Sequence, residues 1–232
     1  MELNNKTLLV TGGTGFIGSH TIVEMLNQSL GFDKIVIIDN LCNSNTVVLQ
    51  RIEQITGKTL GKEFFFESVD IRQRKELNDV FVKYAPIHSV IHFAGLKAVG
   101  ESVSNPLTYY DNNVGGTMVL LELMHAHKTN NIVFSSSATV YGDNALAKEG
   151  DPIFPTNPYG QTKAMVEVIL KDYAHSNKDF SAICLRYFNP VGAHTSGLIG
   201  EDPQGIPNNL MPYIQKIASG HLPHLNVFGT DY

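Results

Sequence analysis

The stretch TLLVTGGTGFIGSH, Thr7 to His20, decides the fold class. It opens as a short apolar run, passes through a glycine-rich turn and continues into a segment of helical character. Gly13, Gly15 and Gly18 satisfy G-x-G-x-x-G, while Gly12, Gly15 and Gly18 satisfy G-x-x-G-x-x-G. Glycines between a strand and a helix let the backbone approach a pyrophosphate, and the helix N-terminus offers amide donors to its phosphates. The turn therefore predicts a dinucleotide site.

An acidic residue ends the next apolar run, KIVIID, at Asp39. A carboxylate here accepts hydrogen bonds from an adenosine ribose and repels a 2′-phosphate, so the pattern favours NAD over NADP. The alternative is a glycine-rich turn that only caps a helix, with Asp39 as a solvated strand end. Asp70 ends the third run, and by itself it fits a ligand contact or a helix cap equally well.

Six apolar runs alternate with segments of helical character along most of the chain. The runs are rich in Val, Ile and Phe without strict polar alternation, which is typical of strands covered on both faces. Helices are predicted over 16–28, 74–84, 113–127 and 159–177. This alternation predicts an α/β fold, a doubly wound parallel Rossmann-type sheet with right-handed crossovers and ligands at the carboxyl ends of the strands.

The amino-acid composition changes after Asn189, where proline and glycine become frequent. We therefore expect an NAD-binding Rossmann domain over 1–189. Residues 190–232 are expected to be the start of a smaller, incomplete C-terminal substrate domain, with a short helix over 210–219.

Composition and charge exclude several classes of protein. Hydrophobic residues make up 43% and charged residues 17%, which argues against disorder, and no apolar run approaches the roughly 18 residues of a membrane span. A net charge of −5 argues against a basic surface that binds a nucleic-acid backbone. The N-terminus lacks the features of a signal peptide, so a cytoplasmic protein is expected. Neither the two cysteines, Cys42 and Cys184, nor the histidines have the spacing of metal ligands.

The stretch NPYGQTKAMVE places Tyr159 four residues before Lys163, on one face of a predicted helix. Tyrosine normally titrates near about 10, but a neighbouring lysine and an oxidised nicotinamide both favour the phenolate and would make it a usable base. Such a pair also arises by chance in many chains. The preceding strand ends in Ser135, Ser136 and Ser137, and one serine hydroxyl would complete a proton path; a polar strand end that satisfies its own backbone is the alternative.

With TGGTGFIG, the Tyr159-x-x-x-Lys163 pair and the serine triplet, the sequence resembles the extended short-chain dehydrogenase/reductase family. The blocks HFAGLKAVGESV, from His92, and RYFNPVGAH followed by GEDPQGIPNNLMPYI are similar to the branch that interconverts UDP-glucose and UDP-galactose. This resemblance implies an isomerase of galactose metabolism with NAD as its cofactor and UDP-glucose and UDP-galactose as its substrates. It also suggests a homodimer that pairs the helices predicted over 113–127 and 159–177.

The same resemblance assigns the site residues position by position. The catalytic residues would be Ser137, Tyr159 and Lys163. The cofactor would be held by Gly12, Gly15, Phe16, Ile17, Gly18, Asp39, Asn40, Leu41, Cys42, Asn43, Ser44, Asp70, Ile71, Phe93, Ala94, Gly95, Lys97, Asn112, Ser135, Tyr159, Lys163 and Phe188. The UDP-sugar would contact Ser137, Tyr159, Asn189, Asn209, Asn226, Val227 and Phe228.

Three alternatives remain open from the sequence. The family pattern continues beyond Tyr232 with the rest of the substrate lobe, so the chain could be an NAD-binding fragment or module without turnover. A 4,6-dehydratase would share the first oxidation, but that branch carries Asp and Glu after the strand-end serine, where this chain has Ala138 and Thr139. Acceptance of N-acetylated UDP-sugars is also undecided.

Overall fold

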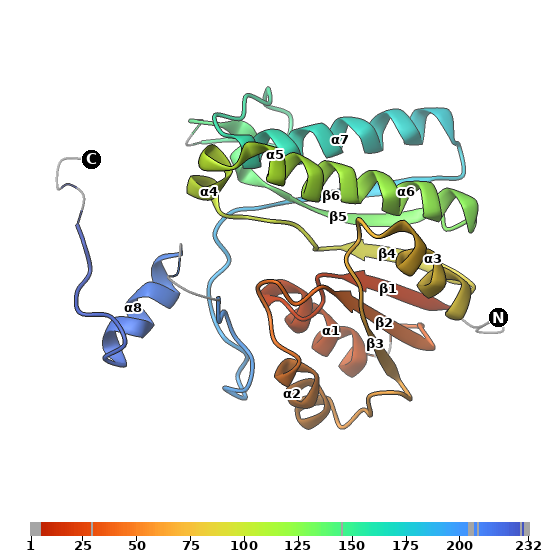
Figure 1. The fold of residues 1–232 in the computed structure, drawn as a ribbon, viewed down its shortest axis with the longest axis horizontal. Coiled ribbons are helices and arrows are strands. Elements are labelled where there is room, and N and C mark those ends of the chain that lie inside the picture. The colour runs from red at the N-terminus through yellow and green to blue at the C-terminus, as the bar shows by residue number, and fades with distance from the viewer. Residues whose placement is uncertain are drawn as a thin grey trace.

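The computed structural model describes residues 6–28, 30–144, 146–203, 207, 209–227 and 229. These residues contain a sheet in the order β3-β2-β1-β4-β5-β6, and every neighbouring pair is parallel (Figure 1). The strands are β1 Thr7–Thr11, β2 Lys34–Asp39, β3 Phe64–Ser68, β4 Ile87–His92, β5 Asn131–Ser137 and β6 Ser181–Tyr187. The strand order reverses between β1 and β4, where such sheets bind ligands. The predicted doubly wound α/β fold is confirmed.

Helices cover the sheet in two layers, with α1 and α2 on one face and α3, α6 and α7 on the other (Figure 1). The α-helices are α1 Phe16–Gln28, α2 Val47–Thr56, α3 Arg74–Lys83, α4 Val99–Ser104, α5 Pro106–Tyr109, α6 Gly116–Ala126, α7 Pro158–Ser176 and α8 Leu210–Ala218. A π-helical turn, η1 Tyr110–Gly115, precedes α6, and a 3₁₀ turn, η2 Ala138–Tyr141, follows β5. The helix predicted over 113–127 therefore begins in η1, while α2, α4 and α5 were not predicted.

The central strands bury side chains on both faces, which explains their unbroken apolar sequence. On β1, Leu8 and Val10 pack with α1 and α2, while Leu9 between them packs with the α3, α6 and α7 layer. All three side chains are at most 1% exposed. Because successive side chains of a strand point to opposite faces, a strand between two helical layers needs apolar residues at every position.

The edge strand β6 differs from the central strands. Its residues Ile183 and Leu185 are 55% and 40% exposed, whereas Ala182 and Cys184 pack against the core under α7. The expectation that every strand is covered on both faces is wrong here. Among the described residues, α7 covers one face of β6 and no helix covers the other.

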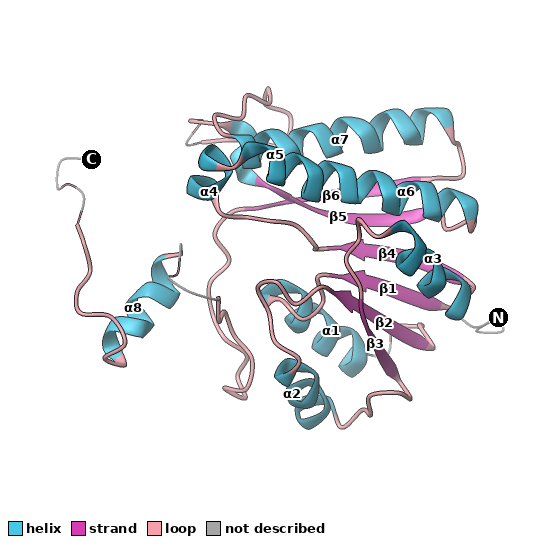
Figure 2. Cartoon of the chain, viewed as in Figure 1, coloured by secondary structure: helices cyan, strands magenta, loops and turns pink. Residues whose placement is uncertain are grey.

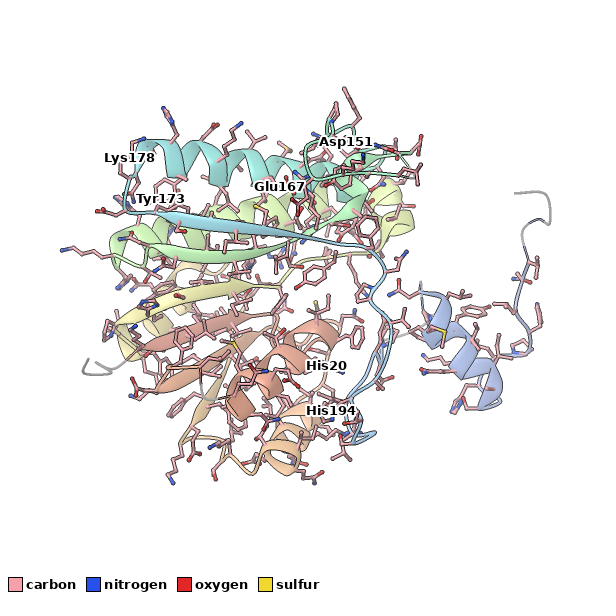
Figure 3. The ribbon with its side chains drawn as sticks, turned by 180° about the vertical axis from the view of Figure 1, so that it is seen from behind. His20, Asp151, Glu167, Tyr173, Lys178 and His194 are labelled. Atoms are coloured by element: carbon pink, nitrogen blue, oxygen red, sulfur yellow. The ribbon has the colours of Figure 1, made fainter. Side chains whose placement is uncertain are left out.

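Residues 190–203, here called the strap, leave β6 and run past the carboxyl edge of the sheet towards α1 (Figure 2). Contacts with α1 and its apolar cluster hold the strap there. Ile199 is 3% exposed within the cluster formed by α1 and α2, and the ring of His194 lies 6.3 Å from that of His20 on α1, the two residues facing each other in Figure 3. The helix predicted over 210–219 is observed as α8. The domain division after residue 189 stays a prediction.

Within the described part of the chain, no helix has the length and apolar character required to cross a lipid bilayer.

Candidate active site

The turn between β1 and α1 is packed too tightly for any side chain at two positions. Gly12 has φ +66°, and a Cβ on it would lie 2.6 Å from the backbone nitrogen of Ala94. A Cβ on Gly18 would lie 2.4 Å from the carbonyl oxygen of Gly12. The first turn of α1 therefore sits directly on the strand end, and its unpaired amide groups offer a bare site for a phosphate.

Asp39 ends β2 beside this turn, and its carboxylate already accepts three hydrogen bonds. The donors are the backbone nitrogens of Thr14 at 3.2 Å and Leu41 at 2.9 Å, and the hydroxyl of Ser44 at 3.1 Å. These bonds fix the orientation of the carboxylate. Since an ionised carboxylate has about four acceptor positions, one is left for a ligand hydroxyl.

The resemblance assigns Asp70 to the cofactor, but in the structure the carboxylate of Asp70 is bonded to other side chains of the protein. Its carboxylate forms a two-pronged ion pair with the guanidinium of Arg72, with bonds of 3.0 and 2.7 Å, and accepts a hydrogen bond from Asn40. The Arg72 guanidinium holds the pKa of the Asp70 carboxyl well below its usual range. Asp70 and Leu41 do not line the cavity described next, whereas Asn40 does.

A cavity of about 390 Å³ opens at the carboxyl ends of β1, β4, β5 and β6. This is within the usual range for small-molecule sites. Most of the residues predicted from the sequence line it. They are Gly12, Gly15, Phe16, Ile17, Gly18, Asp39, Asn40, Cys42, Asn43, Ser44, Ile71, Phe93, Ala94, Gly95, Lys97, Asn112, Ser135, Ser137, Tyr159, Lys163, Phe188, Asn189 and Asn209.

The start of α7 is defined by its own sequence. Asn157 is the N-cap, and its side chain accepts a hydrogen bond of 2.8 Å from the backbone nitrogen of Gly160, while Pro158 occupies the first helical position. The helix therefore presents Tyr159 in its first turn and Lys163 one turn later, and both line the cavity.

Lys163 is buried, with 4% of its surface exposed. Its ammonium donates a 2.7 Å hydrogen bond to the carbonyl oxygen of Ser135 and lies 4.8 Å from the ring centroid of Phe134. Burial lowers the pKa of Lys163 to about 8, because desolvation penalises the charged form. The ammonium lies 5.8 Å from the ring centroid of Tyr159, so the cation and the phenol share the site.

The phenol of Tyr159 is controlled by two opposing effects. Burial is the larger effect and raises the pKa of the phenol above its ordinary value, and a hydrogen bond with Ser137 offsets part of this rise. The hydroxyl oxygen of Ser137 accepts bonds from both the backbone nitrogen and the hydroxyl of Thr139, at 3.2 and 2.9 Å. Because Ser137 is already an acceptor from Thr139, its own proton is available to Tyr159. This arrangement gives the phenol oxygen a donor that stabilises its ionised form.

The η1 turn contributes polar side chains from the far wall of the site. Asn112 lines the cavity, and the next residue, Asn113, bonds the backbone nitrogen and oxygen of Leu96 at 2.8 and 3.0 Å and the hydroxyl of Thr162 at 3.0 Å. Asn113 thus ties the loop after β4 to α7, one residue from Lys163. A π-helical turn at a functional site is a common feature of enzymes.

His92, 1% exposed at the end of β4, bonds Thr11 at 2.6 Å through Nδ1 and Thr117 at 2.9 Å through Nε2. Thr117 uses its own proton on the carbonyl of Asn113, so Nε2 of His92 is the donor and Nδ1 accepts from Thr11. Burial, together with the charge of Lys163, lowers the pKa of His92 to about 3. A neutral histidine on β4 therefore connects β1 to Thr117 in the first turn of α6.

Some predicted substrate residues are not brought to this site. Asn226 and Val227 are exposed and do not line the cavity, and Phe228 lies outside the described residues. Conversely, the cavity includes residues that were not predicted, namely Ile38, Val69, Leu96, Val99, Ser136, Ala138, Thr139, Tyr187, Pro190, Glu201, Asp202 and Pro203. Several are neighbours of predicted residues in the sequence. Residues 201 to 203 belong to the strap, and the sequence pattern does not predict where the strap lies relative to the sheet.

No group of three or more His, Cys, Asp or Glu side chains within the described ranges is arranged to hold a metal ion. The basic and amide donors of the cavity suit phosphates instead.

The family model described as GDP-mannose 4,6 dehydratase matches residues 9–232. The chain belongs to this family. Within the GDP-mannose 4,6 dehydratase family, it is 52% identical over 229 residues to UDP-glucose 4-epimerase 2 of Arabidopsis thaliana and 53% identical over 234 residues to UDP-glucose 4-epimerase of Dictyostelium discoideum. These matches cover 98% and 100% of this chain but 64% and 66% of the relatives, so the chain spans somewhat less than two thirds of their length.

A solved structure leads to the same group within the family. The crystal structure of UDP-glucose 4-epimerase from Bifidobacterium longum in complex with NAD+ and UDP superposes with a TM-score of 0.90 at 50% identity. The alignment covers 97% of this chain and 66% of that protein. The resemblance to UDP-hexose epimerases inferred from the sequence motifs is confirmed.

Proposed function

We propose that this chain is the NAD-binding and catalytic part of a UDP-glucose 4-epimerase, which interconverts UDP-galactose and UDP-glucose through a 4-keto sugar. The observation that carries the proposal is the convergence of Ser137, Tyr159 and Lys163 on one cavity beside the glycine turn. The Bifidobacterium longum relative, which is described as a complex with NAD+ and UDP, supports the same ligands for this chain.

NAD fits the residues that line the cavity. Gly12 and Gly18 let the first turn of α1 pack closely on the end of β1, which places a helix N-terminus at the cavity for a ligand's phosphates, and Asp39 has one acceptor position left for a ribose hydroxyl. Lys97, Asn112 and Tyr159 also line the cavity. When bound, NAD supplies the acceptor and later the donor of the hydride at carbon 4 of the sugar, together with a positive charge near the phenol.

Tyr159 is the base in this proposal. It removes the proton of the sugar 4-hydroxyl as the C4 hydrogen leaves, and it returns the proton after the sugar has turned its other face to the site, which inverts carbon 4 without net redox change. Ser137 donates to the phenol oxygen and relays the proton. The buried ammonium of Lys163 favours the phenolate. Of the predicted substrate residues, Asn189 and Asn209 line the cavity, and Asn226, Val227 and Phe228 stay proposed contacts.

Two other functions are less well supported. A 4,6-dehydratase needs an additional acid and base after the strand-end serine, but Ala138 and Thr139 occupy those positions, and the hydroxyl of Thr139 is bonded to Ser137. An NAD-binding fragment without turnover is the second alternative, since the chain spans only 64% and 66% of the length of the two relatives. We place the protein in galactose metabolism and in the cytoplasm, as an assignment that follows from the proposed reaction.

The decisive experiment is to incubate the purified protein with UDP-galactose and to follow UDP-glucose by proton NMR. Tyr159→Phe should retain NAD and reduce turnover by about 10²- to 10⁴-fold, the usual contribution of a general base. Thr162→Ser, which keeps the hydroxyl on the same helix, serves as the control. Turnover that survives in Tyr159→Phe would exclude Tyr159 as the base, and bound NAD without any product in the unaltered protein would identify the fragment alternative.

A further inference from the structure

One carboxylate joins the cofactor side of the cavity to the substrate side. Oε1 of Glu201, on the strap, accepts a 2.8 Å hydrogen bond from the ammonium of Lys97 and a 2.5 Å bond from the side-chain amide of Asn209. Lys97 follows β4, and Asn209 is the N-cap of α8. All three residues line the cavity, and the side chain of Glu201 is only 10% exposed.

The position of this carboxylate conflicts with the ligands proposed for the cavity. Lys97 is assigned to the cofactor and Asn209 to the UDP-sugar, and both ligands carry a diphosphate. A carboxylate bonded to these donors repels phosphates that need the same donors. Solvent screens this repulsion only in part, because the side chain of Glu201 is 10% exposed and that of Lys97 is 49% exposed. Glu201 therefore stands where ligand oxygens are expected.

Asn209 is diverted from its ordinary role by this contact. An asparagine at a helix N-cap normally accepts a hydrogen bond from a backbone amide of the first turn. Here its side chain makes no cap hydrogen bond and donates to Glu201 instead. When Glu201 is displaced, the amide of Asn209 becomes free for a ligand.

We propose that Glu201 is a placeholder that couples the binding of the cofactor to the binding of the UDP-sugar. Whichever ligand binds first takes its own donor from Glu201, Lys97 for the cofactor or Asn209 for the UDP-sugar. The bridge then opens, and the other donor is released to the second ligand. By linkage each ligand then raises the affinity for the other by the same factor. This inference rests on the proposed function, and it assigns Glu201 a role in ligand affinity without a role in the chemical step.

The test measures the dissociation constant of UDP by calorimetry, with protein freed of nucleotide and with protein saturated with NAD. In the unaltered protein, NAD should tighten UDP binding by about 5-fold or more, the lower end of usual couplings. Glu201→Gln keeps the shape but removes the charge, so the bridge should weaken. The effect of NAD should then fall below about 2-fold, because UDP already binds more tightly to the NAD-free variant.

Asp202→Asn is the matched control, because the neighbouring side chain also lines the cavity and also loses one negative charge. It should keep the coupling of the unaltered protein. If NAD and UDP each bind but do not affect one another, or if Glu201→Gln and Asp202→Asn change the coupling equally, the placeholder role is wrong while the proposed function stands. If the unaltered protein binds neither nucleotide, both proposals fail.

Discussion

At the scale of single residues, the site keeps an ammonium almost entirely out of water. Lys163 is 4% exposed, and its partners are the carbonyl oxygen of Ser135 and the face of Phe134 rather than a carboxylate. Neither partner compensates desolvation as an anion would. The lowered pKa of Lys163, about 8, shows that the fold keeps this charge at a cost in stability. A buried cation of this kind is typical of a functional site.

The desolvation of the Lys163 ammonium predicts that the stability of the protein depends on pH. Above about pH 8 the native protein has released a proton from Lys163, whereas the unfolded chain still binds it up to the ordinary lysine pKa of 10.5, so stability rises with pH through this window. Between about pH 7 and 9.5, the unfolding free energy of the unaltered protein should rise by about 2 kcal/mol relative to that of Lys163→Met. Urea unfolding of both proteins measures this. Lys171→Met, an exposed lysine on the same helix, controls for the lost charge, and parallel curves for the unaltered protein and Lys163→Met would contradict the prediction.

At the scale of elements, one ion pair joins four parts of the fold beside the catalytic residues. Glu167 on α7, which Figure 3 shows on the side of the helix next to β6, binds the guanidinium of Arg186 on β6 through two bonds of 3.0 and 2.7 Å. Glu167 also accepts a 2.5 Å bond from Ser136 on β5, and Arg186 donates to the hydroxyl of Tyr141 in η2. Ser136 precedes Ser137, and Glu167 follows Lys163 by one helical turn. The pair therefore fixes α7 against the strand that carries the catalytic serine.

Removing one member of this pair should be costly. The two side chains are only 20% and 9% exposed, so Glu167→Gln leaves the Arg186 charge without its counter-ion and should lower the free energy of unfolding by about 3 kcal/mol. Replacing both residues by methionine should lower the free energy of unfolding by less than the sum of the losses in Glu167→Met and Arg186→Met, because no unpaired charge remains in the double variant. Urea unfolding of the two single variants and the double variant measures the coupling. Additive losses would show that the pair contributes nothing as a unit.

At the scale of the whole molecule, apolar side chains of the described residues are exposed on the outer helical layer and on the open face of β6. The first of these areas is the outer helical layer, where Met118 of α6 and Met165 and Val168 of α7 are 39%, 39% and 55% exposed. The two helices are neighbours, joined by a 2.8 Å hydrogen bond between His125 and Tyr173. The other area is the open face of β6. Apolar areas of this kind often mark association surfaces.

We expect a homodimer formed through α6 and α7, as the family resemblance suggests. Val168→Glu should shift the protein towards the monomer in sedimentation velocity, because a charge would be buried in the shared surface. Ile183→Glu is the matched control, since Ile183 is equally exposed at 55% but lies on β6. If only Ile183→Glu dissociates the dimer, the interface lies on β6, and a protein that is monomeric at every concentration would exclude a dimer.

Local patterns in the sequence determined the sheet, the glycine turn and the catalytic helix. The turn at Gly12, the acid at Asp39 and the Asn157 cap that places Tyr159 and Lys163 all depend on neighbours within one strand, turn or helix, so their spacing was readable. Unbroken apolar runs identified β1 and β2 correctly. The same pattern wrongly predicted that helices cover both faces of β6, because an edge strand with one open face can also carry apolar residues on that face.

Only the tertiary structure decided how distant polar groups pair. His92 depends on Thr11 and Thr117, Asp70 accepts from the distant Asn40, and Glu201 reaches across the cavity to Lys97. A single sequence cannot specify these pairs, because a polar side chain finds a partner only after the elements have packed, and many residues of the right chemistry are available along the chain. The sequence thus determined which chemistry the site contains, and the packing of the strap and helices determined which donors and acceptors meet, since burial makes every unpaired polar group costly.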